Sequence, residues 1–387
     1  MADEVPLVVV AAGGTGGHLF PAEALAAALG RRNVRVNLVT DERATRYGDA
    51  FPAEATHIVP SATVRGRSPI ELARTGLVLG RGVWAAYRLF GRIAPAAVVG
   101  FGGYPSIPPV LAGVLRRVPT LIHEQNGVAG RANRMLAPRV TAIATGFPGV
   151  FARSPGLAAK ATQTGNPVRP AVAAAALVPY PDSDKAFQIL IFGGSQGARI
   201  MAEIVPPAIE LLPVALRAKL TIVQQARDED VDGVRSAYAR IGVPADIRPF
   251  FRDLPARIAL SHLVVSRAGA STVAELAAIG RPSILVPLPH ALDQDQMANA
   301  GMLENAGGAI RLRQTAFSPE RLADEIMRLA VEPETLPAMA KAARSIGIVD
   351  AADRLADLVL KVAKITPAEA PLPLKPESYV PPANEPS

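Results

Sequence analysis

Short apolar runs alternate with longer segments of helical periodicity along this chain of 387 residues. The runs carry almost no charge, as expected of parallel strands that are buried on both faces. Predicted strands cover residues 5–11, 34–39, 96–100, 120–122, 142–144, 189–192, 220–223, 245–249, 263–265 and 284–286. Predicted helices cover about residues 21–31, 72–93, 109–115, 271–279, 319–331, 336–345 and 351–362. This alternation predicts an α/β fold with doubly wound parallel sheets.

One glycine-rich turn, at 101–104, follows the strand at 96–100. Two others, at 13–17 and 193–198, follow the first strand of each predicted half and come directly before helices. Each such unit is the expected start of a Rossmann-like domain. We therefore predict two doubly wound domains, at 1–165 and 166–365, with residues 147–187 as the connection. Carboxyl ends of two sheets that face each other across a cleft would enclose a substrate between the domains.

Residues 263–300 begin with a strand, a turn of small residues and a helix. Ser271 or Thr272 is the expected N-cap, and Glu275 lies at the spacing of a capping box. Such a helix start offers free N–H groups and the positive end of the helix dipole to a phosphate. Glu275 is therefore either a capping partner or a carboxylate that accepts both hydroxyls of a nucleotide ribose.

Polar side chains follow predicted strands at two further places. Residues 293–296 and Asn299 come after the strand at 284–286. They suit a hydroxyl-rich ligand such as a sugar, and equally an ordinary helix N-terminus. Residues 123–126 follow the strand at 120–122, where an open α/β sheet places its ligand site.

His18 lies directly after the first glycine-rich turn. Its position at a helix start suits either a catalytic group or a packed, structural histidine. A dinucleotide-binding fingerprint would need its third glycine at Leu19, so that motif is incomplete. Asp41 nevertheless lies where a ribose-binding acid is expected, which leaves a nicotinamide-dependent oxidoreductase as an alternative.

Composition excludes several classes of site. The chain has no cysteine, so it forms no disulfide and no Cys-ligated metal site, and its five histidines lack metal-binding spacing. The acidic N-terminus leads into a strand and not into a signal peptide, and no segment resembles a membrane span. We therefore expect a soluble protein made in the cytoplasm, with a disordered proline-rich tail at 366–387.

Charge is unevenly distributed. Residues 1–170 hold 19 Lys and Arg against 9 Asp and Glu, a formal charge of +10, whereas the remainder holds 22 against 25, or −3. This asymmetry indicates an anionic partner for the N-terminal half. Apolar residues and arginines alternate over 72–93, which fits a solvated surface helix or a helix lying on anionic headgroups. Aromatic residues, at 5%, are too sparse for a single-stranded nucleic-acid platform, so we expect no nucleic-acid partner.

Six blocks of sequence, in order, resemble the MurG-type bacterial UDP-N-acetylglucosamine transferases of the GT-B fold. The blocks are GGTGGHLFPA (13–22), GFGGYPSIPPVLAG (100–113), HEQNGVAGRANRMLA (123–137), GNPVR (165–169), GGSQGA (193–198) and SRAGASTVAELAAIGRPSILVP (266–287). They span most of residues 5–300, and residues 366–387 have no counterpart.

The resemblance implies transfer of GlcNAc from UDP-GlcNAc to the C4 hydroxyl of MurNAc in undecaprenyl-pyrophosphoryl-MurNAc-pentapeptide (lipid I), which gives lipid II for peptidoglycan synthesis. An α-linked donor and a β-linked product require one inverting displacement, helped by a general base and by groups that hold the UDP leaving group. The resemblance implies that helix ends and basic side chains hold the UDP leaving group, so we expect no cofactor and no obligatory metal. A peripheral protein on the cytoplasmic face of the inner membrane, bound through residues 72–93, is implied, as are partners from cell-wall synthesis or cell division.

The resemblance also implies roles for single residues. His18 and Glu124 are the candidate bases, and we prefer His18 because a neutral imidazole accepts a proton near pH 7. Glu275 is placed on the ribose, Gln296 on the sugar, and the backbone of Phe251 on the uracil. Further expected donor contacts are Thr15, Gly16, Gly17, Asn126, Arg169, Ser195, Ala270, Ser271, Thr272, Val273 and Ala274. The loop 291–295 varies in this family, so the assignment over 293–296 carries a register ambiguity of one position.

Three alternatives remain open from the sequence. Another GT-B enzyme would use a different acceptor, such as a glycolipid. An oxidoreductase would bind NAD and not UDP-GlcNAc. A non-catalytic scaffold would bind the nucleotide sugar without turning it over.

Overall fold

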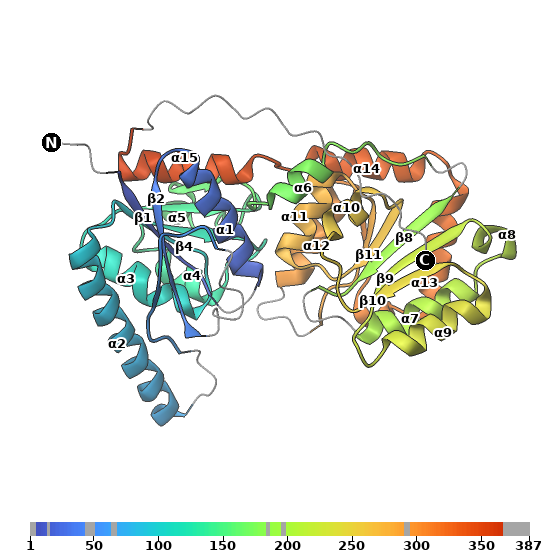
Figure 1. Cartoon of the computed structure of the whole chain (residues 1–387), viewed down its shortest axis with the longest axis horizontal. Helices are drawn as coiled ribbons and strands as arrows, with labels where there is room; N and C mark the ends of the chain where they lie inside the picture. Colours follow the sequence, from blue (N-terminus) through green and yellow to red (C-terminus); the bar gives the residue numbers. More distant parts are fainter. Residues whose placement is uncertain are drawn as a thin grey trace.

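The computed structural model describes residues 5–13, 16–42, 51–62, 68–182, 186–194, 199–289 and 295–366. Within these ranges the chain forms two parallel β-sheets, each with helices packed on both faces (Figure 1). The fold class expected from the sequence, two doubly wound Rossmann-like domains, is confirmed. The expected contacts at Thr15 and Ser195 and the tail after residue 366 lie outside the described residues.

The N-terminal sheet has the strand order β3-β2-β1-β4-β5-β6-β7. Its strands are β1 (Leu7–Ala11), β2 (Arg35–Thr40), β3 (Ala55–Ile58), β4 (Ala97–Gly100), β5 (Thr120–Glu124), β6 (Ala142–Thr145) and β7 (Ala161–Gln163). The helices of this half are α1 (Gly16–Gly30), α2 (Pro69–Ile93), η2 (Tyr104–Ser106), α3 (Ile107–Leu115), α4 (Arg131–Leu136) and α5 (Pro155–Ala158). No helix in the described ranges combines the length and apolar character that a membrane crossing needs.

The C-terminal sheet has the order β10-β9-β8-β11-β12-β13. Its strands are β8 (Phe187–Phe192), β9 (Leu220–Gln225), β10 (Ala245–Arg248), β11 (Leu263–Ser266), β12 (Ser283–Leu285) and β13 (Ala309–Arg311). The remaining helices are α6 (Pro170–Ala175), α7 (Arg199–Glu210), α8 (Val214–Arg217), α9 (Val231–Ile241), α10 (Leu254–Ala259), α11 (Ala270–Ile279), α12 (Asp295–Asn305), η4 (Gln314–Ala316), α13 (Pro319–Val331), α14 (Thr335–Ser345) and α15 (Ala351–Ala363).

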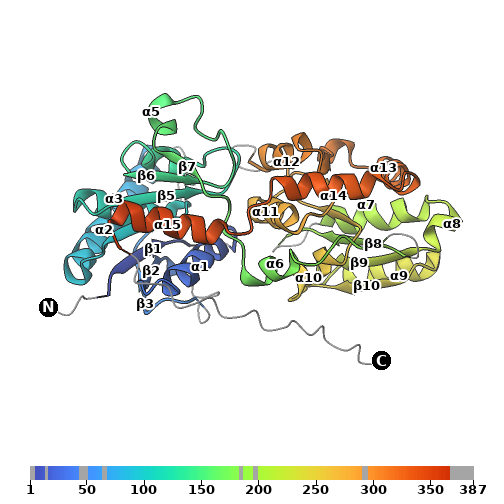
Figure 2. The ribbon, with the colours of Figure 1, turned by 90° about the horizontal axis from the view of Figure 1, so that it is seen from above.

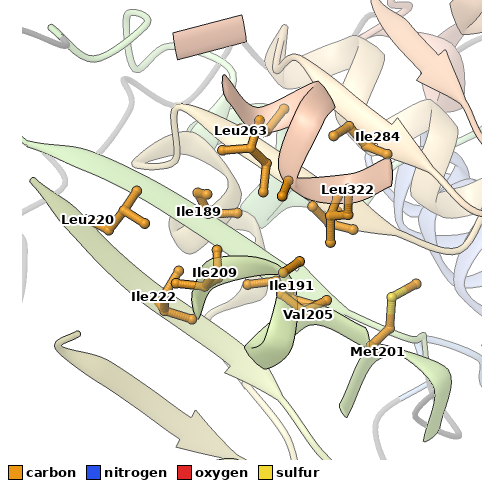
Figure 3. Close-up of a cluster of buried hydrophobic side chains, with 14 of the residues drawn as sticks. Ile189, Ile191, Met201, Val205, Ile209, Leu220, Ile222, Leu263, Ile284 and Leu322 are labelled. Atoms are coloured by element: carbon orange, nitrogen blue, oxygen red, sulfur yellow. The ribbon is translucent and has the colours of Figure 1, made fainter. Parts of the chain in front are cut away.

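Alternating side chains of the central strands supply the core on both faces of each sheet. In β1, Val8 and Val10 belong to the cluster under α1, whereas Val9 belongs to the cluster under α2 and α3. In β8, Ile189 and Ile191 pack with Met201, Val205 and Ile209 of α7 (Figure 3). These residues are buried on both sides because successive side chains of a strand point to opposite faces, which explains the continuous apolar runs in the sequence.

Helix α15 returns from the C-terminal half to cover the N-terminal sheet. Its Leu355 and Val359 are fully buried in the same cluster as α1, and Arg32 of α1 pairs with Asp353 at 2.7 Å and Asp357 at 3.0 Å. Helix α14 lies over the C-terminal half, next to α15 in the chain (Figure 2). Helix α15, which the predicted division assigns to 166–365, therefore packs on the N-terminal sheet, because long-range packing, and not chain order, decides where this helix lies.

Four further details differ from the sequence predictions. Helix α1 begins at Gly16 and not near Pro21, which lies inside the helix and removes one backbone hydrogen bond there. Strand β3 was not expected, and β6 is not the last strand of its sheet, because β7 pairs with it. The expected connection 147–187 holds α5, β7 and α6. Both unexpected strands lie at sheet edges, where short, partly exposed strands lack a clear apolar pattern.

Candidate active site

Each sheet has a point at which its strand order reverses, between β1 and β4 in one and between β8 and β11 in the other. In open α/β sheets the ligand site lies at this point, beyond the carboxyl ends of the strands. Helix α1 begins at the first reversal and α11 at the second, and the two helices contact each other. The two edges that carry the predicted site residues therefore face one another.

His18 lies in the first turn of α1, partly buried. Its Nδ1 is 3.2 Å from Oε1 of Gln125. The imidazole edge lies against Gly102 and Gly103, which have φ angles of +82° and +69°. A Cβ added to Gly103 would lie 3.5 Å from Nε2 of His18, so the glycine leaves the surroundings of that nitrogen free of side chain.

Glu124, the alternative base, is 1% exposed at the end of β5. Its Oε1 accepts the backbone N–H of Asn126 at 2.9 Å and the Asn126 amide at 3.3 Å. Its Oε2 accepts the N–H of Gly130 at 2.9 Å and the Asn133 amide at 2.8 Å. A carboxylate that already accepts four hydrogen bonds is built to hold the loop 124–130, which argues against Glu124 as the base.

Asn126, an expected donor contact, joins the two halves of the molecule through Asn299. The Asn299 amide donates to Oδ1 of Asn126 at 3.0 Å and to the carbonyl of Ala268 at 3.1 Å. Oδ1 of Asn299 accepts the N–H of Gly127 at 2.7 Å. Asn299 is fully buried, so this side chain ties the loop after β5 to the turn after β11.

Helix α11 begins without a side-chain cap. Its N-cap is Gly269, and neither Ser271 nor Thr272 caps it, so the expected capping box is wrong. Small residues at 268–270 let the chain enter the helix without a capping side chain. Within the described ranges the first N–H groups of α11 donate to no acceptor, and the buried Ser271 hydroxyl has no partner. These donors, with the helix dipole, form an anion-binding end.

Glu275 is buried beside Arg169. Oε1 of Glu275 accepts a hydrogen bond from Nη2 of Arg169 at 3.1 Å, and the Arg169 guanidinium lies over the Phe20 ring at 4.9 Å. Burial raises the pKa of the Glu275 carboxyl, and Arg169 opposes that rise. Arg169 thus connects α1 with α11, and among the described residues the ion pair of Glu275 involves Oε1 alone.

Gln296 and Phe251 complete the C-terminal side. Oε1 of Gln296 accepts the N–H of Ala268 at 3.3 Å and of Leu288 at 3.0 Å, which brings its amide to the start of α11. Phe251 is 5% exposed in the turn after β10, and Arg257 lies 4.3 Å above its ring. Gly16 and Gly17 begin α1, while Val273 is buried in α11 and Ala274 packs against the same core cluster. The structure therefore brings most of the described candidates to the two facing edges.

Three further residues of the site were expected from the sequence only as members of polar segments, with no role of their own. Gln125 and His123 lie behind His18, and Asn299 bridges the halves. The sequence showed polar segments after β5 and near 293–299, but it did not show which residues these side chains contact. Within the described ranges no group of three or more His, Asp or Glu side chains is placed to hold a metal ion; metal independence stays a prediction.

Two models of one protein family match the two halves of the chain separately. The glycosyltransferase family 28 N-terminal domain matches residues 8–145, and the C-terminal domain of that family matches residues 188–355. A relative from Rhodopseudomonas palustris is 63% identical over 94% of this chain and 100% of its own length. The chain belongs to glycosyltransferase family 28. The relative is named UDP-N-acetylglucosamine–N-acetylmuramyl-(pentapeptide) pyrophosphoryl-undecaprenol N-acetylglucosamine transferase.

Solved structures agree with this family 28 assignment. MurG of Acinetobacter baumannii has a TM-score of 0.76 and 30% identity, covering 92% of this chain and 99% of its own. A UDP-GlcNAc 2-epimerase from Neisseria meningitidis has a TM-score of 0.65 at 13% identity, covering 92% of this chain and 100% of its own, and shows likeness of fold alone. The family 28 assignment excludes the oxidoreductase alternative left open by Asp41.

Glu124→Ala tests the structural role that the geometry gives this carboxylate. We expect the free energy of unfolding to fall by at least about 2 kcal/mol, because four donors lose a buried acceptor. Urea denaturation measures the change. Glu229→Ala is the control, since Glu229 is exposed and pairs with Arg227 only at 3.7 Å; it should change stability by under about 0.5 kcal/mol. Equal stability of the two variants would contradict the role.

Proposed function

We propose that the protein transfers GlcNAc from UDP-GlcNAc to the C4 hydroxyl of MurNAc in lipid I and forms lipid II with inversion at the anomeric carbon. The observation that carries this proposal is the 63% identity to a transferase of that name over the relative's whole length. The arrangement of α1 and α11 supplies the chemistry such a reaction needs.

The donor binds at the C-terminal edge. The uncapped start of α11, with the unpaired Ser271 hydroxyl, suits the diphosphate. Glu275 accepts the ribose hydroxyls, and the backbone of Phe251 contacts uracil. The nitrogen of the Gln296 amide has no partner within the described ranges and donates to the sugar. Further donor contacts come from Gly16, Gly17, Ala270, Thr272 and Arg169, together with Thr15 and Ser195.

The chemistry needs one base and one site for the leaving group. His18 removes the proton of the acceptor hydroxyl as the oxygen attacks the anomeric carbon and the bond to the UDP oxygen breaks. The positive end of α11 stabilises the charge that develops on the departing diphosphate. Asn126 lies between the two, where Asn299 holds it in place.

The acceptor is a polyprenyl lipid, and α2 is the surface we assign to its membrane. Ile70, Leu77 and Trp84 recur every seven residues and are 68%, 58% and 62% exposed. Arg81 and Arg88 lie beside them on the helix, and the guanidinium of Arg88 lies 5.0 Å above the Trp84 ring. The first half of α2 projects beyond the sheet (Figure 1). An apolar stripe flanked by arginines suits anionic headgroups, on the cytoplasmic face of the inner membrane.

The first test is transfer of radiolabelled GlcNAc from UDP-GlcNAc to a lipid I analogue by purified protein in excess EDTA. We expect transfer that EDTA does not suppress, because helix ends and not a metal hold the diphosphate. If the protein bound UDP-GlcNAc but transferred no GlcNAc, the assignment of lipid I as the acceptor would be contradicted. Transfer only without EDTA would contradict metal independence.

Glu275→Ala should weaken UDP-GlcNAc binding by about 1.5–3 kcal/mol, the range for a hydrogen bond to a charged group. Isothermal titration of the donor measures it. Glu325→Ala is the matched control, because Glu325 is also buried, at 6%, and paired with arginines but lies in α13. Unchanged donor affinity in Glu275→Ala would remove Glu275 from the site.

Arg81→Glu with Arg88→Glu should weaken binding to vesicles of anionic phospholipid by at least about tenfold, since each basic residue near such a surface contributes about 1 kcal/mol. Cosedimentation at low and high salt measures the effect, which salt should diminish. The control, Arg153→Glu with Lys219→Glu, changes the net charge equally at exposed positions away from α2. Equal losses in both double variants would leave α2 without a membrane role.

A further inference from the structure

The side-chain amide of Gln125 has only one orientation compatible with its surroundings. Gln125 is 2% exposed. Its Nε2 lies 3.1 Å from the carbonyl oxygens of Phe101 and His123. Both atoms are acceptors only, so the amide nitrogen must face them and Oε1 must face the other way. The backbone O of Gln125 is itself held by the Asn166 amide at 2.8 Å.

This orientation determines which nitrogen of His18 carries the proton. Oε1 of Gln125 can only accept, and it lies 3.2 Å from Nδ1 of His18. The contact is a hydrogen bond only if Nδ1 is protonated. In the neutral imidazole Nε2 then has the free lone pair, at the edge beside Gly103.

His123 supports the same arrangement from behind. It is fully buried and stacks on Phe101, with ring centroids 5.4 Å apart. Its Nε2 donates to the carbonyl of Gly165 at 3.0 Å. Its Nδ1 is then an acceptor and lies 3.1 Å from Nε2 of Gln125, whose two hydrogens are shared with the two carbonyl oxygens. Burial lowers the pKa of His123 to about 4, so this ring is neutral at physiological pH.

We propose that Gln125 is a positioning residue that holds His18 in the Nδ1–H tautomer, with Nε2 unprotonated and directed to the acceptor hydroxyl. Without Gln125, both tautomers of His18 are available and only part of the protein has a competent base. This inference rests on the proposed function in that His18 is the base.

The titratable and charged groups around His18 come from several elements. His123 of β5 interacts electrostatically with His18. Glu124, also in β5, is engaged by the loop 124–130. On α1 the next such group is Glu23, and Arg169 lies over Phe20. Burial raises the pKa of Glu23, and Arg169 opposes that rise.

The tautomer is measured directly by long-range ¹H–¹⁵N correlation on protein labelled with ¹⁵N-histidine, with His18 assigned by its absence in His18→Ala. We expect an Nδ1–H pattern in the parent protein and a mixture of tautomers in Gln125→Met. The kcat of Gln125→Met should fall by roughly tenfold from loss of orientation, with the KM for UDP-GlcNAc within about threefold. His18→Ala should lose about a hundredfold or more in kcat.

Gln125→Glu gives a second, independent test. Its carboxylate still accepts from Nδ1 but favours the protonated imidazolium. The His18 tautomer pattern should therefore persist, while the acidic limb of the kcat–pH profile moves to higher pH, because the base must lose its proton to act. A purely structural role of Gln125 predicts no such movement.

Gln224→Met is the matched control, because Gln224 is also fully buried and hydrogen-bonded, donating to the Met201 carbonyl at 3.3 Å and accepting from the Tyr238 hydroxyl at 2.6 Å. It should lose stability but keep kcat and the His18 tautomer. An Nε2–H pattern in the parent, or an unchanged pattern in Gln125→Met, would overturn the inference. A His18→Ala variant with kcat within a few-fold of the parent would instead overturn the base role in the proposed function, whatever the tautomer.

Discussion

The carboxylate of Glu124 organises the N-terminal side of the site. Four donors from residues 126, 130 and 133 converge on it, and together they fix the path of the chain after β5. The residues between, Gln125 and Asn126, take their positions from that path. A buried carboxylate is costly unless its hydrogen bonds are made, so the loop and the charge stabilise each other.

Polar side chains connect the two halves at the candidate site. Asn299 bonds both to the loop after β5 and to the turn after β11, and Arg169 lies between Phe20 and Glu275. Each involves a residue that the donor is also proposed to contact or adjoin. Donor binding at α11, as proposed, would therefore be in a position to alter the contacts that hold the base side of the site, through these two side chains.

Local patterns in the sequence predicted most of the fold. Residues 319–331 form α13 as expected, and α11 ends at Gly280 in a left-handed conformation, as a glycine there indicates. The start of α1 was misassigned for a local reason too. Proline is usual in the first turn of a helix, but Pro21 lies inside α1, after its first turn. Local patterns did not reveal which sheet α15 covers, or that β7 extends the N-terminal sheet, because both depend on long-range packing. The sequence named the candidate site as a set of residues, and their roles stay predictions. The direction of the Gln125 amide and the partner of Glu275 depend on atoms far away in the chain, which no local pattern records.

The position of α15 has a consequence for how the protein is made. The helix that covers the β1 and α1 side of the N-terminal sheet is translated after every strand of the C-terminal sheet. On the ribosome, this face of the first sheet therefore stays without α15 until residues 351–363 emerge, although α1 already packs on Val8 and Val10. Domains generally fold in order of synthesis, but here the N-terminal half is synthesised first and completed last. Until α15 is made, the nascent chain must keep this apolar face from contact with other proteins.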